Sequence, residues 1–246
     1  MKPIRLFSTD LDGTVVGDNE ATARFRDFWQ SLPQETRPLL VFNSGRLLDD
    51  QFELMEEVPL PNPDYVIGGV GTLLFGRDRP SLKQAYAASL GQAFDTHKIV
   101  SVMSSVSGAS VQPARYQHDL KSSWYLHDAS GADISDIERR LVENEIDARI
   151  VYSSNRDLDI LPRAADKGAA IQWLCNHLDI GLDEVVVAGD TGNDRAMFEL
   201  PGVRGIVVSN ALPELKGLAV DKDHVFRAPD AEADGVMSGL RHWLSL

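Results

Sequence analysis

Short apolar runs that end abruptly in polar or glycine residues constrain the fold of this 246-residue chain. Unbroken runs of this kind are typical of strands that are buried on both faces of a parallel sheet. We therefore expect an α/β fold whose core is a Rossmann-like parallel sheet. The runs occupy residues 4–9, 38–43, 65–67, 185–188 and 206–208.

Helical patterns separate these runs. Residues 21–32 and 48–57 follow the first two runs, and residues 171–178 place apolar side chains at the spacing i, i+3, i+4 and i+7. Strands that alternate with helices indicate parallel pairing through crossover connections. We therefore expect the strands at the two ends of the chain to form the two halves of one sheet.

The middle of the chain has a different composition, with aromatic, polar and β-branched residues mixed around an acidic helical segment at 134–144. This mixture predicts a small α+β unit with antiparallel strands. We expect a catalytic core at residues 1–79 and 163–246, with an inserted cap domain at 80–162 that selects the substrate. The candidate cap strands are residues 116–118, 122–127 and 148–152.

The charge balance excludes several classes of partner. The chain carries 24 Lys and Arg against 37 Asp and Glu, a formal net charge of −13. Such a surface repels polyanions, so we expect neither nucleic acid nor an anionic membrane as a partner. Cys175 is the single cysteine, and no signal-like or membrane-spanning run is present, so we expect a cytoplasmic monomer.

Two acids follow the first apolar run, in the sequence Asp10-Leu11-Asp12-Gly13-Thr14. Open α/β sheets bind ligands at the carboxyl ends of their strands, so a paired carboxylate here suggests chemistry. A calcium loop is excluded, because its sixth and twelfth positions would be Val15 and Ala21 rather than Gly and Glu. An ordinary Asp-Gly turn remains the alternative.

Three further signals stand at the ends of predicted core elements: Ser44, Lys167 and the segment 189–194, Gly-Asp-Thr-Gly-Asn-Asp. Each alone has a structural explanation, as a helix N-cap, a solvated lysine or a turn. All of them in this order, after the paired acids, indicate one functional site.

Together, these four segments resemble the motifs of the haloacid dehalogenase superfamily of phosphatases, with a large α+β cap between the second and third motifs. The chain is most similar to the sucrose-phosphate phosphatase group of that superfamily. The residues that suggest this group are 11–19, 121–124 and 152–162. The second motif often carries Thr where this chain has Ser44, which keeps the hydroxyl.

The resemblance implies a role for each motif. Asp10 would attack phosphorus and form an aspartyl-phosphate, and Asp12 would protonate the departing sugar oxygen. Asp12 must therefore begin protonated, which neighbouring carboxylates would favour. The implied cofactor is Mg²⁺, held by Asp10, the Asp12 backbone carbonyl, Asp190 and Asp194. The implied phosphate-binding residues are Ser44, Gly45, Lys167 and Asn193.

The leaving group would lie between core and cap, where polar side chains recognise sugar hydroxyls. The implied substrate is a disaccharide phosphate, mannosylfructose 6-phosphate first and sucrose 6-phosphate as the alternative. A phosphoryl transferase and a receiver-like phospho-aspartate signalling module are two further alternatives. The candidate sugar residues are Asn43, Arg46, Lys121, Ser123, Ser153, Ser154, Asn155, Asp157 and Asp159.

Overall fold

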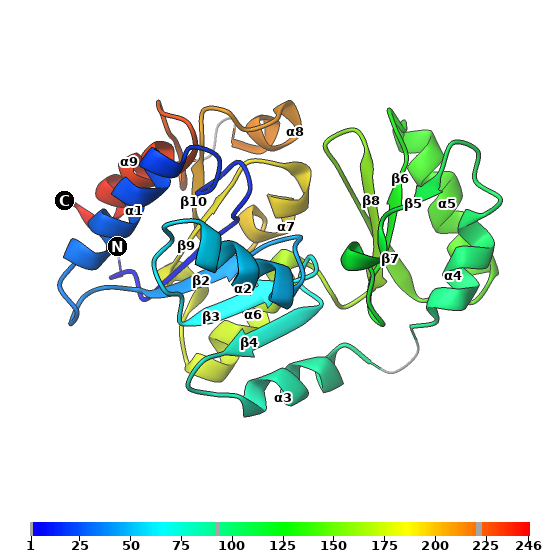
Figure 1. The fold of residues 1–246 in the computed structure, drawn as a ribbon, viewed down its shortest axis with the longest axis horizontal. Helices are drawn as coiled ribbons and strands as arrows, with labels where there is room; N and C mark the ends of the chain where they lie inside the picture. The colour runs from blue at the N-terminus through cyan, green and yellow to red at the C-terminus, as the bar shows by residue number, and fades with distance from the viewer. Residues whose placement is uncertain (1, 92–93, 220–222) are drawn as a thin grey trace.

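The computed structural model describes residues 2–91, 94–219 and 223–246 (Figure 1). Within these residues the strands form one seven-stranded and one four-stranded sheet. The large sheet contains β1 (Leu6–Thr9), β2 (Leu39–Asn43), β3 (Tyr65–Gly68), β4 (Leu73–Gly76), β9 (Val185–Gly189), β10 (Arg204–Val207) and β11 (Val225–Arg227). The small sheet contains β5 (Ser110–Val111), β6 (Ser122–Tyr125), β7 (Ala148–Ser153) and β8 (Asp157–Pro162).

The large sheet has the order β11-β10-β9-β1-β2-β3-β4, and every pair is parallel except β3 with β4. The small sheet, in the order β5-β6-β8-β7, is antiparallel. The predicted fold class, a parallel α/β core with a separate α+β cap, is therefore confirmed. We call the small sheet with its two helices the cap.

Helices cover both sheets (Figure 1). Those of the core are α1 (Asn19–Ser31), α2 (Leu48–Glu57), α3 (Ser81–Ser89), α6 (Lys167–Leu178), α7 (Arg195–Phe198), α8 (Pro213–Lys216) and α9 (Glu232–Leu244). Those of the cap are α4 (Thr96–Met103) and α5 (Gly131–Glu143). Short 3₁₀ turns are η1 (Ala114–Tyr116), η2 (Leu182–Glu184), η3 (Gly192–Asp194) and η4 (Gly217–Ala219). No helix among the described residues is long and apolar enough to cross a membrane.

Apolar side chains form two separate clusters, one per sheet. In the core, Phe7 on β1 packs against Phe25 and Trp29, which α1 presents one turn apart. Asp18 caps α1 by accepting hydrogen bonds from the backbone of its first turn. In the cap, buried side chains of α4 and α5 pack on the sheet.

Two local expectations need correction. The strand predicted at residues 116–118 does not form: Tyr116 ends η1, and His118 makes only an isolated bridge with Lys121. Helix α3, which the predicted boundary at residue 80 assigns to the insertion, packs on the core: Tyr86 contacts Trp173 of α6 with ring centroids 5.0 Å apart. The domain boundaries otherwise stay a prediction.

Candidate active site

The parallel register brings four motifs to one edge of the large sheet. Thr9 pairs with Phe42 on β2 and with Ala188 on β9, so the residues that follow these three strands are neighbours. The residues directly after these strands are Asp10, Ser44 and Asp190, all buried. Helix α6 begins at the same edge with Lys167, directly after its N-cap Asp166.

Lys167 lies at the centre of this edge and is fully buried, at 0% exposure. Its Nζ lies 2.9 Å from Asp10 Oδ1 and 2.7 Å from Asp194 Oδ1. Burial alone lowers the pKa of an ammonium group, but the charges of Asp10 and Asp194 outweigh it and raise the pKa of Lys167. The lysine is therefore a permanent buried cation.

Asp10, Asp190 and Asp194 each offer a carboxylate oxygen, and these oxygens all lie within 4.8 Å of one another. Three carboxylates and one lysine leave two uncompensated negative charges in a buried site. Burial raises the pKa of Asp10 to about 7 and that of Asp190 to about 8. An oxygen-only site of this charge fits a hard divalent cation such as Mg²⁺.

The acids differ in how the protein holds them. Both oxygens of Asp194 are engaged, Oδ1 by Lys167 and Oδ2 by the backbone N–H groups of Asp190 and Thr191. This pattern suits an orienting role for Asp194. Asp190 accepts one hydrogen bond from Thr14 Oγ1, at 3.0 Å.

Asp12 stands outside the buried cluster, with its side chain 52% exposed. Gly13, directly after Asp12, has φ of +74°, and a Cβ there would lie 2.4 Å from Asp190 Oδ2. The chain therefore needs glycine at this position. Asp12 pairs with Arg46, which also reaches Asp50 at 3.1 Å. The direct partner of Asp12 is thus Arg46, and the charge of Asp12 also helps to raise the pKa of the nearby Asp10, so an expected carboxylate neighbour is present too.

The predicted phosphate-binding residues lie beside Asp10. Ser44 Oγ accepts a hydrogen bond from the backbone N–H of Arg46, and a Cβ on Gly45 would approach Asn193 Nδ2 at 3.9 Å. Asn193 Oδ1 and Thr191 Oγ1 are buried and have no hydrogen-bond partner among the described residues. Buried polar atoms without partners mark places where a ligand or water completes the site.

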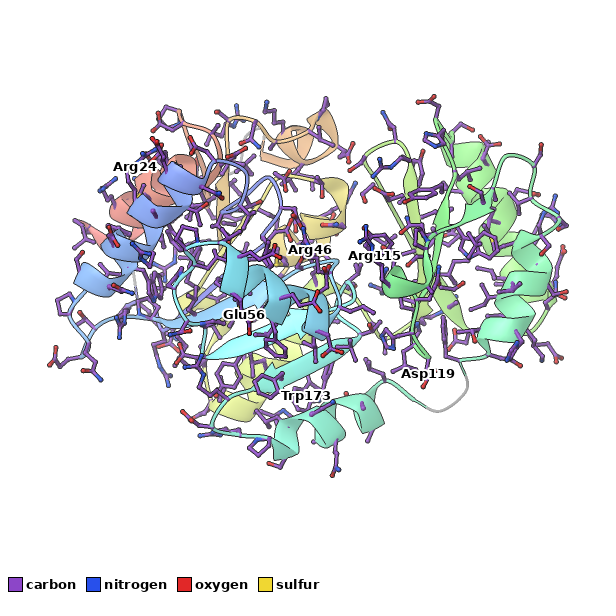
Figure 2. The ribbon with its side chains drawn as sticks, in the orientation of Figure 1. Arg24, Arg46, Glu56, Arg115, Asp119 and Trp173 are labelled. Atoms are coloured by element: carbon purple, nitrogen blue, oxygen red, sulfur yellow. The ribbon has the colours of Figure 1, made fainter. Side chains whose placement is uncertain are left out.

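A cavity of about 340 Å³ extends from Asp10 toward the cap. It brings together most of the predicted site residues: Asp10, Asp12, Ser44, Gly45, Arg46, Lys121, Ser153, Ser154, Asp157, Asp159 and Asn193. Its lining residues come from the core, such as Asp10, and from the cap, such as Lys121, so the cavity is shared by both units. Figure 2 shows the boundary between the two units, with Arg46 on the core side and Arg115 on the cap side.

Three predicted sugar residues do not line this cavity. Asn43 is buried below it and donates to the backbone carbonyl of Lys167 at 3.0 Å. Ser123 is buried beside it and donates to Asp159 Oδ1 at 2.6 Å. Asn155 lies in the turn between β7 and β8 with φ of +50°. The first two therefore support other residues of the site.

Sequence reasoning also missed residues that line the cavity. Tyr125 and Arg156 form a cation–π pair, with the guanidinium 5.4 Å from the ring centre. The sequence gives no signal for either residue: Tyr125 on β6 resembles an ordinary solvent-facing strand residue, and Arg156 resembles an ordinary turn residue. The lining residues not predicted are Asp50, Gln112, Tyr116, Tyr125, Arg156 and Thr191.

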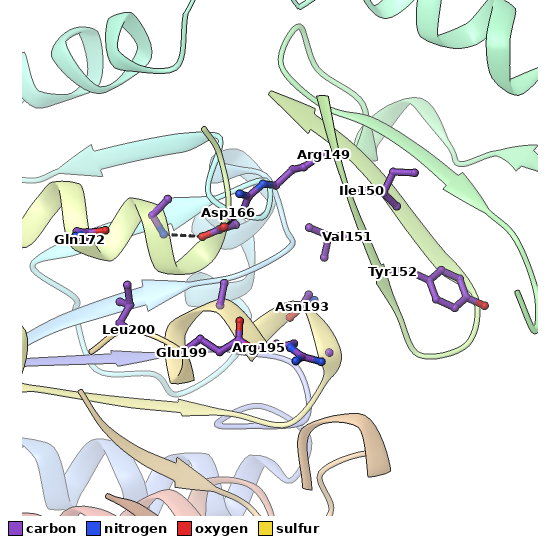
Figure 3. A pocket seen from close by; sticks show the side chains of 13 residues that line it. Arg149, Ile150, Val151, Tyr152, Asp166, Gln172, Asn193, Arg195, Glu199 and Leu200 are labelled. Carbon is purple, nitrogen blue, oxygen red and sulfur yellow. Dashed lines mark hydrogen bonds and ion pairs between the residues drawn. The ribbon is translucent and has the colours of Figure 1, made fainter. Parts of the chain in front are cut away.

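A second, larger cavity of about 570 Å³ lies between β7 and helices α6 and α7 (Figure 3). The ion pair between Arg149 and Asp166 spans it at one end, joining the cap to the start of α6. Neither Asp10 nor Asp12 is among its lining residues. The chemistry therefore belongs to the smaller cavity, and Asn193 is the residue common to both.

Comparison with known proteins agrees with this geometry. The sucrose-6F-phosphate phosphohydrolase family matches residues 3–244. The chain is 65% identical over 243 residues to mannosylfructose-phosphate phosphatase of Agrobacterium fabrum, covering 99% of this chain and 98% of that protein.

Two solved structures are similar to this chain over nearly its whole length. The sucrose-phosphatase of Synechocystis sp. PCC6803, solved with sucrose and phosphate, has a TM-score of 0.89 at 27% identity and covers 98% of both chains. A sugar phosphatase of haloacid dehalogenase subclass IIB has a TM-score of 0.66 at 14% identity, covering 97% of this chain and 98% of its own. The second likeness concerns the fold alone.

Proposed function

Since the chain belongs to the sucrose-6F-phosphate phosphohydrolase family of phosphatases, we propose that it hydrolyses a phosphorylated disaccharide, most specifically mannosylfructose 6-phosphate. Sucrose 6-phosphate is the second candidate, because the similar Synechocystis enzyme was solved with sucrose and phosphate. Both compounds present a fructose 6-phosphate end. The family match favours a phosphatase over the receiver-like alternative.

One observation supports this proposal most directly. A single cavity joins the buried Asp10, beside Lys167, to polar side chains of the cap, among them Lys121, Ser153 and Asp159. A phosphate needs the first set of groups, and sugar hydroxyls need the second. A phosphorylated sugar is a ligand that satisfies both ends of the cavity at once.

In the first step, Asp10 Oδ attacks phosphorus and forms an aspartyl-phosphate bond as the bond from phosphorus to the sugar oxygen breaks. Asp12 transfers its proton to that oxygen, which leaves as the sugar hydroxyl. In the second step, water attacks phosphorus and gives a proton to Asp12. The aspartyl bond breaks, and Asp10 returns to its carboxylate form.

The remaining core residues hold the phosphoryl group during both steps. Lys167 would neutralise charge beside Asp10, and the hydroxyl of Ser44 and the amide of Asn193, which line the same cavity, would contact phosphoryl oxygens. Asp10, the Asp12 backbone carbonyl and Asp190 would hold Mg²⁺, with Asp194 orienting Lys167 and a bound water. When bound, the ion supplies charge neutralisation for the phosphate.

Phosphate release tests the proposal. Purified protein is assayed with mannosylfructose 6-phosphate and sucrose 6-phosphate, in Mg²⁺ and in EDTA. We expect Mg²⁺-dependent release with the higher kcat/KM for mannosylfructose 6-phosphate. Negligible or equal rates on both compounds would refute the specific substrate, and undiminished rates in EDTA would refute the cofactor.

The nucleophile is tested separately. Asp10→Asn removes the attacking oxygen at nearly constant volume, so we expect loss of turnover with an unchanged circular dichroism spectrum. Excess free sugar in the wild-type assay distinguishes hydrolysis from transfer. A new sugar phosphate among the products would support the transferase alternative.

A further inference from the structure

The turn between β3 and β4, residues 69–72 with the sequence Gly-Val-Gly-Thr, has no part in the chemistry above, yet it contacts three parts of the site. On the core side, Val70 N donates to Ser44 O at 3.2 Å and Gly69 N donates to Arg46 O at 2.8 Å. The turn thus holds the backbone of the phosphate-binding loop on both sides of Gly45.

The same turn lies against the start of α6. Gly71 has φ of +85°, and a Cβ there would lie 2.2 Å from the backbone oxygen of Asp166, the residue before Lys167. Tyr86 of α3 donates its hydroxyl to the backbone oxygen of Gly71. Val70 is fully buried with φ of +56°, a conformation that a β-branched residue adopts only when its surroundings enforce it.

The last residue of this turn, Thr72, contacts the cap. Thr72, only 1% exposed, has its Oγ1 2.8 Å from Nε2 of His118, in the cap segment between η1 and β6. The backbone N–H of Leu120 donates to His118 Nδ1 at 3.2 Å, so Nε2 carries the proton and donates to Thr72. Thr72 then donates to the Gly69 carbonyl at 2.8 Å. Burial lowers the pKa of His118 to about 4, which agrees with a neutral ring.

His118 is in turn tied to a residue of the substrate cavity. His118 and Lys121 exchange two backbone hydrogen bonds, of 3.1 and 2.9 Å. Lys121 is buried at the cavity, with Nζ 2.8 Å from Asp159. Leu120, between them, packs on the apolar cluster of the core. A continuous path of contacts therefore joins Lys121 of the cap to Ser44 of the core.

We propose that Thr72 and His118 are positioning residues. Their hydrogen bond keeps the sugar-binding side chains of the cap at a fixed position relative to the phosphate-binding loop of the core, residues 44–46. This inference rests on the proposed function. A sugar phosphate must contact both units at once, so an error in their register weakens binding of the whole substrate. Inorganic phosphate contacts the core alone and is insensitive to that register.

Two single variants and their combination test the inference. Thr72→Val keeps the shape and removes the hydroxyl. His118→Asn keeps an acceptor for Leu120 N but is too short to reach Thr72. Each should raise KM for mannosylfructose 6-phosphate about fivefold, as expected for one lost hydrogen bond, with kcat within about twofold of wild type. The inhibition constant of inorganic phosphate should not change.

The combined variant should be no worse than either single one, because both remove the same bond. Thr72→Ser, which keeps the hydroxyl, should restore the wild-type KM, and the exposed Thr36→Val serves as the control. An unchanged KM, additive effects in the combined variant, or a parallel rise in the phosphate inhibition constant would each overturn the inference.

Hydrogen exchange separates this inference from the proposed function. If wild-type protein releases no phosphate from either sugar phosphate, the proposed substrate class fails on its own. Thr72→Val should still speed amide exchange at residues 118–121 relative to Thr36→Val, since it removes the side-chain hydrogen bond between this cap segment and the core. Unchanged exchange in this segment would overturn the positioning role whatever the substrate.

Discussion

Arg46 donates two hydrogen bonds to Asp12, from Nε to Oδ2 at 2.7 Å and from Nη2 to Oδ1 at 2.8 Å. This bidentate pairing engages both carboxylate oxygens of Asp12, the residue from which the departing sugar oxygen needs a proton. The two side chains are 29% and 52% exposed. A solvent-exposed pair contributes only about 1 kcal/mol, so substrate binding can separate it.

Arg46→Gln should raise KM for the sugar phosphate about tenfold, a change worth ~1.4 kcal/mol. The cavity also contains Asp12, Asp50, Asp157 and Asp159, and without the guanidinium their charges repel a phosphate dianion. Arg46→Lys should recover part of the loss. Arg24→Gln is the control, because Arg24 forms an equivalent bidentate pair with Asp234 outside the site. An unchanged KM in Arg46→Gln would contradict this role.

Asp12→Asn should lower kcat for the sugar phosphate by about 10² to 10⁴-fold, the range for loss of a general acid. The loss should be smaller for p-nitrophenyl phosphate, because nitrophenolate departs without a proton. Steady-state rates on both substrates measure the difference. Asp50→Asn, which changes the other partner of Arg46, should stay within a few-fold of wild type. Equal losses on both substrates would count against proton donation by Asp12.

Lys167→Met should destabilise the metal-free protein by about 3 kcal/mol at pH 8, because it leaves buried carboxylates without their cation. Urea unfolding in EDTA measures the free energy. The exposed Lys83→Met should change stability by less than about 0.5 kcal/mol. A loss below about 1 kcal/mol for Lys167→Met would show that the cluster is more solvated than its burial indicates.

The buried carboxyls make the metal-free protein sensitive to pH. Burial raises the pKa of Asp10 to about 7 and that of Asp190 to about 8, above their unfolded values near 4. The folded state then holds protons that the unfolded state has released, so stability falls as pH rises through 7 and 8.

We therefore expect the melting temperature in EDTA to fall between pH 6 and pH 8.5. Mg²⁺ should raise it more at pH 8.5, because the cation binds the ionised carboxylates. Asp10→Asn should show a weaker pH dependence, and a far-surface variant such as Glu35→Gln should follow wild type. An equal effect of Mg²⁺ at both pH values would refute this linkage.

Much of the fold could be predicted because strand and helix signals are local. The apolar runs correspond to β1, β2, β3, β9 and β10, and the helical period at 171–178 lies within α6. The edge strand β4 was not predicted, although it pairs with the strand directly before it. The packing of α3 was not predicted because it depends on a contact far along the chain, between Tyr86 and Trp173. The predicted strand at residues 116–118 was wrong because its aromatic and polar pattern also suits a turn.

The meeting of Asp10, Ser44 and Asp190 could be predicted from the order of the motifs, because parallel strands bring their carboxyl ends to one edge of a sheet. The pairing of side chains around that edge becomes visible in the folded protein: Lys167 pairs with Asp10, Arg46 with Asp12, and Thr72 with His118. A repeating pattern encodes which face of an element is buried. It does not encode which distant side chain that face meets, since that depends on how the core and the cap pack together.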